Sequence, residues 1–185
     1  LFALFGRRRA DYVEFRELNP WYRFHFQDGE SFDYGGTLDQ TLDEIERLSP
    51  ADRARYPVLL AQSKRIFDVG FTRLAARPFH NPMAMLAQTP HLIRLRSDRS
   101  VWRMIRHYIR DPRLAQALAI SPLLVGGNPM TTTSIYSLIH YLEREWGVHF
   151  AMGGTGALVR ALKTLMDESG IAWIPNATVS GFTYD

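Results

Sequence analysis

The hydrophobic period changes from that of a strand to that of a helix near residue 37, and this change limits the fold more than any other feature. Apolar and polar residues alternate over Tyr22–Gln27, which is the period of a β-strand. Asp28-Gly29 follows and suits the positive φ angles of a tight turn, so we expect Tyr22–Gln27 and Glu30–Tyr34 to pair as a hairpin. An earlier run, Tyr12–Leu18, alternates less regularly and would add a third strand.

Beyond residue 37 the apolar spacing becomes helical. Ser49-Pro50-Ala51-Asp52 combines a capping hydroxyl, a proline and an acid, and it predicts a helix that runs to about Leu74. Asn81-Pro82 and Asp111-Pro112 repeat the order of cap and proline. A further helix is expected over about 132–145, ending at Gly147.

The last part of the chain, 148–185, mixes both periods. Val148–Phe150 is short and extended, Gly153–Gly156 opens a helix, and Gly170 closes it. Ile171–Ile174 and Thr178–Thr183 then read as strands. We therefore predict an α+β fold, with a mostly helical part and a small antiparallel sheet in 1–147, followed by a helix–strand piece of an α/β domain in 148–185.

Charge is concentrated in one stretch. The chain has 22 Lys and Arg against 19 Asp and Glu. From Lys64 to Arg113, however, eleven basic residues face three acidic ones, a net +8. Such a stretch suits a solvated helix face, an anionic membrane surface, phosphorylated ligands or nucleic acid. An amphipathic helix with a basic side is expected over 99–110. Its candidate membrane-contacting residues are Arg99, Trp102, Arg103, Arg106 and Arg110.

Several kinds of site are excluded by what the sequence lacks. There is no Cys, so disulfides and thiolate sites are ruled out, and no histidine pairing typical of a zinc protease occurs. Gly154-Thr155-Gly156 has two glycines of a dinucleotide fingerprint but not the third. Glu143 and Glu145 lie on different helix faces, and Arg144 between them is placed to hold either one. Because the chain begins at Leu1, we expect it to be a piece of a longer protein.

Four segments together carry a resemblance to a known family. Ser134–Phe150 leads directly into Met152–Val159, and Leu123–Pro129 and Leu18–Arg23 lie upstream. These segments resemble the bacterial-type phytoene desaturases, carotenoid-forming flavoproteins of the amine-oxidase-like group. The similarity extends over nearly the whole chain.

The resemblance implies an FAD-dependent oxidoreductase that acts on CH–CH bonds and converts phytoene to neurosporene or lycopene. It implies that 1–147 is part of a substrate-binding, membrane-associating domain and that 148–185 is a fragment of a Rossmann-like FAD-binding domain. Val179 then lies where a backbone contact to the adenine of FAD is usual. The candidate substrate-binding residues are Asn128, His140, Arg144 and Glu145.

The family's pyrophosphate-binding glycine motif is absent here, so we expect these residues alone neither to hold FAD nor to desaturate a substrate. The expected partners are phytoene, later carotene intermediates and a membrane surface, in a cytoplasmic, peripherally membrane-associated enzyme. No nucleic acid is expected, and homo-oligomer formation stays open. Another carotene desaturase or a carotene isomerase of the same family is the alternative. A basic nucleic-acid- or membrane-binding module is the alternative of another class.

Overall fold

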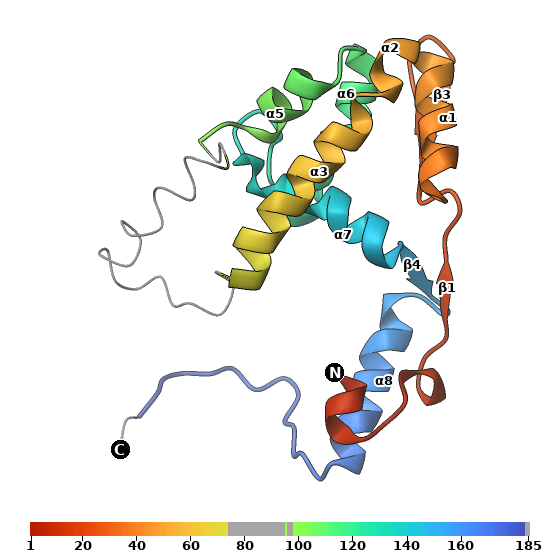
Figure 1. Cartoon of the computed structure of the whole chain (residues 1–185). Coiled ribbons are helices and arrows are strands. Elements are labelled where there is room, and N and C mark those ends of the chain that lie inside the picture. Colours follow the sequence, from red (N-terminus) through yellow and green to blue (C-terminus); the bar gives the residue numbers. More distant parts are fainter. Residues whose placement is uncertain (74–94, 96–97, 184–185) are drawn as a thin grey trace. The chain divides into compact units, whose positions relative to one another are not determined.

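A computed structural model describes residues 1–73, 95 and 98–183 (Figure 1). It divides the chain into two compact units: a smaller one made of Leu1–Glu17 and His149–Asp185, and a larger one made of Leu18–Val148. The helix expected from Asn81-Pro82 lies outside the described residues.

The larger unit is mostly helical. Its elements are β2 Tyr22–His25, β3 Ser31–Tyr34, α1 Leu38–Leu48, α2 Pro50–Arg53, α3 Tyr56–Phe67, the π-helical η3 Asp68–Arg73, α5 Val101–Tyr108, α6 Pro112–Leu118, the 3-10 turns η4 Ser121–Val125 and η5 Ser134–Ser137, and α7 Leu138–Trp146. Its largest fully buried side chains include Phe32, Ile45, Tyr56, Leu59, Ile66, Ile105, Ile109, Leu114 and Leu118. These elements therefore share one hydrophobic core.

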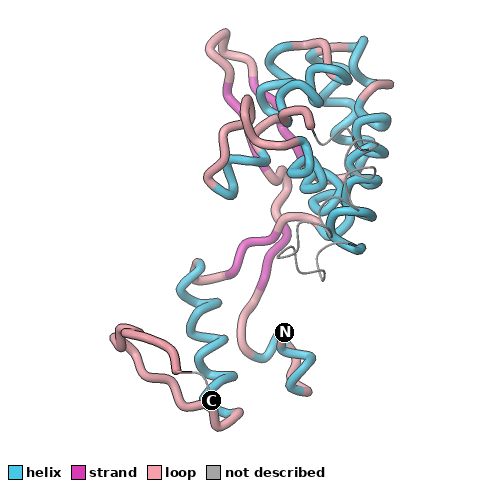
Figure 2. Tube along the Cα trace, turned by 90° about the vertical axis from the view of Figure 1, so that its left-hand side faces the viewer, coloured by secondary structure: helices cyan, strands magenta, loops and turns pink. Residues whose placement is uncertain are grey.

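The hairpin expected from the sequence is confirmed. β2 and β3 pair antiparallel, with Tyr22 opposite Tyr34 and Phe24 opposite Phe32, and Gly29 in the turn has a φ of 88°. Figure 2 shows the two strands side by side. The polar side of β2 is exposed and its aromatic side is half-buried, because alternate side chains point to opposite faces.

The expected third strand exists but pairs elsewhere. β1 Phe15–Glu17 is antiparallel to β4 His149–Ala151, with Glu17 opposite His149. Residues 1–17 are expected from the sequence to belong to the same domain as the rest of 1–147, whereas the structure groups them with the C-terminal residues. A strand's partner is set by long-range packing, which the local pattern does not contain.

The helix predicted from Ser49 to about Leu74 reaches that far but is interrupted near its start. α2 ends at Arg53 and α3 begins at Tyr56, since Pro57 has no N–H to donate to the carbonyl of Arg53. The π-helical η3 then continues α3 to Arg73. The Ser49 hydroxyl does not cap α2; it donates to the carboxylate of Asp52 instead.

Two other predicted helix boundaries agree with the structure. The Asp111 carboxylate caps α6 and accepts from the backbone N–H groups of Arg113 and Leu114. The helix predicted over 132–145 is the 3-10 turn η5 followed by α7, and it ends at Gly147, whose φ is 70°. A glycine tolerates this positive φ without strain.

The smaller unit contains η1 Phe2–Phe5, η2 Arg9–Asp11, β1, β4 and α8 Thr155–Glu168. The predicted helix between the glycine turn and Gly170 is therefore confirmed. The two strands predicted over Ile171–Ile174 and Thr178–Thr183 are wrong, because 171–183 has no regular secondary structure. An isolated strand needs a partner, and no described strand pairs with this segment.

The described residues include no helix long and apolar enough to span a bilayer.

Candidate functional site

The polar side chains of α7 meet the hairpin in the interior of the larger unit. We call this group the α7 polar cluster, and it consists of Tyr22, Tyr34, Tyr56, His140, Glu143 and Arg144. Because these residues come from β2, β3, α3 and α7, the cluster exists only when the larger unit is folded.

Arg144 connects α7 to the segment after the hairpin. Its guanidinium donates to the carbonyl of Gly36 at 2.7 Å and to the hydroxyl of Thr41 at 2.8 Å. It also lies over the Trp21 ring, with 4.6 Å from its Cζ to the ring centroid, which is a cation–π distance. Trp21 packs closely on Gly35, where an added Cβ would lie 2.5 Å from the backbone nitrogen of Trp21. Arg144 is thus a structural link between the helix and this tight turn.

His140 lies one turn before Arg144 and is 3 % exposed. Its Nδ1 is 3.4 Å from the hydroxyl of Tyr34, which in turn lies 3.1 Å from the hydroxyl of Tyr56. Burial lowers the pKa of His140 from 6.5 to about 4; the Leu118 carbonyl partly offsets this, and Arg144 adds to it. The imidazole is therefore neutral at pH 7 and has one N–H to donate.

Glu143 is the ionisable carboxyl of the cluster. It accepts a 2.8 Å hydrogen bond from the Tyr22 hydroxyl. Burial raises the pKa of Glu143, and the Tyr22 hydrogen bond and the Arg144 charge oppose this increase. Burial also raises the pKa of Tyr22, so its hydroxyl keeps its proton and stays a donor. A buried carboxyl with a perturbed pKa beside a cavity is the type of group found at functional sites.

Of the four predicted substrate-binding residues, the structure brings two together. His140 and Arg144 belong to the cluster. Glu145 is exposed on the other side of α7. Asn128 is exposed. Its side-chain oxygen accepts a hydrogen bond from the N–H of Met130, and its backbone carbonyl accepts one from the N–H of Thr132, so Asn128 stabilises its own loop.

Sequence reasoning missed the role of Glu143. It compared Glu143 only with Glu145, two positions away, although Glu143 is three residues from His140 and so lies on a neighbouring part of the same helix face. The i, i+3 spacing was the available signal. The expectation that Arg144 holds one of these acids is wrong, because its guanidinium bonds Gly36 and Thr41 instead.

The predicted basic helix is shorter than expected. α5 spans Val101–Tyr108, so Arg99 and Arg110 lie outside it. Arg103, Arg106 and Arg110 are exposed, and Arg106 donates to the carbonyl of Arg110 beyond the helix end. Arg106 also lies over the ring of Trp102. Within the described part of the chain, none of these arginines forms a salt bridge.

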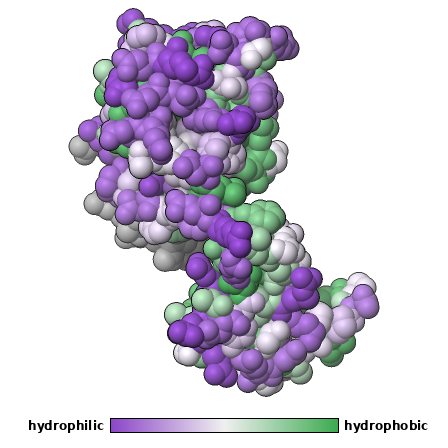
Figure 3. Space-filling view, turned by 90° about the vertical axis from the view of Figure 1, so that its right-hand side faces the viewer, coloured by the Kyte–Doolittle hydropathy of each residue, from purple (hydrophilic) through white to green (hydrophobic). Residues whose placement is uncertain are grey.

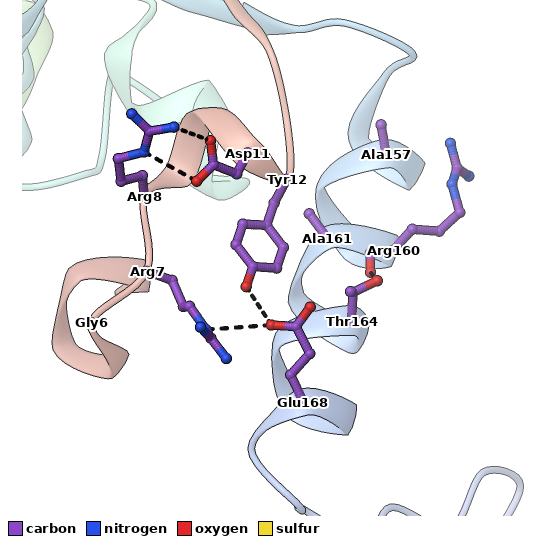
Figure 4. Close-up of a pocket in the computed structure, with 10 residues that line it drawn as sticks. All are labelled: Gly6, Arg7, Arg8, Asp11, Tyr12, Ala157, Arg160, Ala161, Thr164 and Glu168. Atoms are coloured by element: carbon purple, nitrogen blue, oxygen red, sulfur yellow. Dashed lines mark hydrogen bonds and ion pairs between the residues drawn. The ribbon is translucent and has the colours of Figure 1, made fainter.

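The smaller unit has an open pocket of about 830 Å³ between its N-terminal turns and α8 (Figure 4). Arg7 lies 3.4 Å from the carboxylate of Glu168, which also accepts from the hydroxyl of Tyr12. Arg8 is paired with Asp11. Carboxylates therefore already pair with Arg7 and Arg8, whereas Arg160, which also lines the pocket, has no salt bridge among the described residues.

The glycine turn before α8 has a positive φ at Gly153 and Gly154. An added Cβ at Gly154 would meet nothing within 4 Å, and at Gly156 only the end of the Arg160 side chain. Val179 is 71 % exposed on a segment of the smaller unit without regular structure.

No family model matches the chain, but curated proteins do. It is 42% identical over 170 residues to a lycopene-forming phytoene desaturase of Pseudescherichia vulneris, and 41% identical over 180 residues to one of Pantoea ananas. A neurosporene-forming phytoene desaturase of Cereibacter sphaeroides is 33% identical over 167 residues. These matches cover 92%, 97% and 90% of this chain but only 35%, 37% and 32% of the relatives. Over nearly its whole length the chain is therefore homologous to bacterial phytoene desaturases, and it corresponds to about one third of the length of each of them.

Proposed function

We propose that the protein containing this chain is an oxidoreductase that introduces double bonds into phytoene and forms neurosporene or lycopene. The observation that carries this proposal is the identity of 41–42% over more than nine-tenths of the chain to two lycopene-forming phytoene desaturases. The chain spans about a third of their length, so the activity belongs to the complete protein.

We further propose that FAD is the oxidant and that the larger unit is part of the substrate domain. A bound flavin would accept the hydride removed from the polyene. Phytoene has no charged group, so its site requires apolar lining and shape. In the larger unit, Arg144 of α7 bonds Gly36 and lies over Trp21, the residues that flank the aromatic hairpin. It therefore holds the aromatic side chains of the hairpin in place against α7, where they could line such a site.

The test is expression of the complete protein in a bacterium that makes phytoene, with chromatography of the extracted pigments. The proposal predicts loss of phytoene and appearance of a coloured carotene with more conjugated double bonds. The chain 1–185 alone is the matched control and should leave phytoene unchanged. Unaltered phytoene with the complete, flavin-loaded protein would contradict the proposal, and a product with the same number of double bonds would favour the isomerase alternative.

We also propose that α5 and its flanks contact an anionic membrane surface. The support is a group of exposed arginines without salt bridges among the described residues, near Trp102. Backbone bonds tie the start of α5 to the loop that follows η4, because Trp102 N donates to the carbonyl of Pro129. Leu123, Leu124 and Val125 of η4 are each at least 57% exposed and would add apolar contact. On the face shown in Figure 3, apolar side chains reach the surface in both units.

Liposome flotation of the complete protein tests this surface. Arg99, Arg103, Arg106 and Arg110 are changed to Gln, and binding to phosphatidylglycerol vesicles is expected to fall about fivefold per residue, from roughly 1 kcal/mol each. The control changes four arginines that form salt bridges, Arg16, Arg23, Arg47 and Arg53, to Gln. Equal loss of binding in both variants, or no loss in the first, would contradict the proposed surface.

A further inference from the structure

Four aromatic rings of the larger unit gather where α3 packs against α7. We call them the ring cluster, and it consists of Phe67, Phe71, Tyr141 and Trp146. Phe67 is its centre, because its ring centroid lies 5.3 Å from that of Phe71, 5.1 Å from that of Tyr141 and 5.8 Å from that of Trp146. These are the distances of aromatic rings in direct contact. The four rings therefore form one continuous apolar surface.

Much of the ring cluster is open to solvent. Phe71 is 55% exposed and Trp146 is 57% exposed, and the other two rings are half-buried. The shared core of the larger unit, as the described residues define it, includes none of the four rings. Single exposed apolar side chains need no explanation, whereas a group of them in mutual contact is typical of a binding surface.

The backbone that carries Phe71 is also unusual. α3 continues directly as the π-helical η3, and Phe71 lies within this π-helical turn. Such turns are rare, and they occur frequently at functional sites. The rings of Phe67 and Phe71 are stacked across the junction of α3 and η3, with an interplanar angle of 16°. The backbone is thus a second observation that points to a binding role for the same rings.

The charged groups beside the ring cluster favour an uncharged occupant. Lys64 forms a 2.9 Å salt bridge with Asp68, and its ammonium lies 5.2 Å from the ring centroid of Tyr141. Burial and the nearby Glu145 carboxylate raise the pKa of Tyr141. One paired lysine and two carboxylates give these rings no positive surroundings, in contrast to the exposed arginines near α5. An anionic membrane surface is therefore disfavoured here, and a neutral apolar molecule is favoured.

We propose that the ring cluster binds the hydrocarbon chain of phytoene, an inference that rests on the proposed function. A C40 polyene offers no charge and no hydrogen bond, so its binding depends on apolar contact, and aromatic side chains supply a large contact area. Phe71 and Trp146, the more exposed rings, are the contact residues. Phe67 and Tyr141 contact both of them or one of them and hold them in place.

Steady-state kinetics of the complete, flavin-loaded protein with phytoene in phosphatidylcholine vesicles tests the inference. Phe71→Leu and Trp146→Leu are each expected to raise the KM for phytoene roughly fivefold, with unchanged flavin content. Trp146→Phe keeps an aromatic ring and should restore most of the lost affinity. Phe5→Leu in the smaller unit is the matched control, since Phe5 is 47% exposed, and it should leave the KM unchanged.

Flotation of the same variants with the same vesicles separates substrate binding from membrane binding, and it should show no change. The inference is overturned by an unchanged KM in Phe71→Leu and Trp146→Leu, or by an equal rise in Phe5→Leu. A loss of vesicle binding that accounts for the higher KM also overturns it, because the rings would then contact the membrane. If the unsubstituted protein leaves phytoene unchanged, the proposed function fails, and this inference fails with it.

Discussion

The two units differ in how completely they cover their apolar residues. In the larger unit, Ile45, Leu59 and Ile105 are wholly buried within a shared core. The core of the smaller unit has four buried residues, while Ile174 and Phe182 are each more than 80% exposed. The larger unit therefore encloses an extensive core, although Leu123, Leu124 and Val125 remain exposed on it. The smaller unit has only a small core and apolar surface that its described residues leave uncovered.

The strongest test of this contrast removes an acceptor from the larger unit. Asp52 is fully buried, and its carboxylate accepts from the backbone N–H groups of Arg110 and Asp111, both at 2.8 Å. Asp52→Ala leaves both donors unsatisfied and should lower the free energy of unfolding by about 4 kcal/mol. Urea unfolding measures this. Asp43→Ala, at a largely exposed site, is the control, and similar losses in the two variants would refute the role assigned to Asp52.

A second test uses pH. Because the pKa of His140 is about 4 in the folded state and 6.5 without burial, the unfolded state binds more protons between these values. The contribution of neutral His140 is fully present above pH 6.5 and is lost as pH falls toward 4, by up to about 3 kcal/mol. Glu143, whose pKa is raised, acts in the opposite direction above pH 4.5. Unfolding of His140→Gln over this range should show a weaker dependence on pH than the unsubstituted protein. Identical slopes would mean that His140 is not buried neutral.

Replacing one buried leucine by alanine in each core compares how much the two cores contribute to stability. Leu59→Ala in α3 should cost about 4 kcal/mol, near the upper end for such changes, because the surrounding core is closed. Leu165→Ala in α8 should cost about 2 kcal/mol, because it belongs to a core of only four buried residues, whose partly buried neighbours can relax into the space. Hydrogen exchange of α3 and α8 amides reports each unit separately. The contrast between the units fails if Leu165→Ala costs as much as Leu59→Ala.

The smallest expected effect concerns the surface of the smaller unit. Lys163 and Asp167 form a salt bridge one turn apart on α8, with both side chains about half exposed. Lys163→Gln should change the free energy of unfolding by less than about 0.5 kcal/mol and should have no effect in high salt. Thermal unfolding at two salt concentrations checks this. A larger, salt-independent change would show that Lys163 contributes through packing, including its contact with the Trp173 ring.

Sequence reasoning found the features that depend on local chemistry. The Asp28-Gly29 hairpin, the Asp111 cap and the end of α7 at Gly147 each follow from a few neighbouring residues. It failed where the decisive partner is distant. β1 pairs with a strand more than 130 residues later, and the expected strands after Gly170 have no described partner.

The candidate site shows the same limit. His140 and Arg144 were identified as candidates through the family resemblance, and both belong to the α7 polar cluster. The partner of Glu143 is Tyr22, which lies 121 residues earlier, and no spacing rule connects them. The assignment of Val179 to FAD stays a prediction, and so does the assignment of Asn128, His140, Arg144 and Glu145 to the substrate.

One backbone hydrogen bond extends the pairing of β1 with β4. The backbone N–H of Leu18 donates to the carbonyl of Val148 at 2.9 Å, directly beyond the paired residues Glu17 and His149. The chain thus leaves and re-enters the two-stranded ladder at adjacent points. A segment whose two ends lie close together can be inserted into another protein with little change to the host structure. Grafting Leu18–Val148 between the same two strands of a related desaturase would transfer its shape without lengthening either connection.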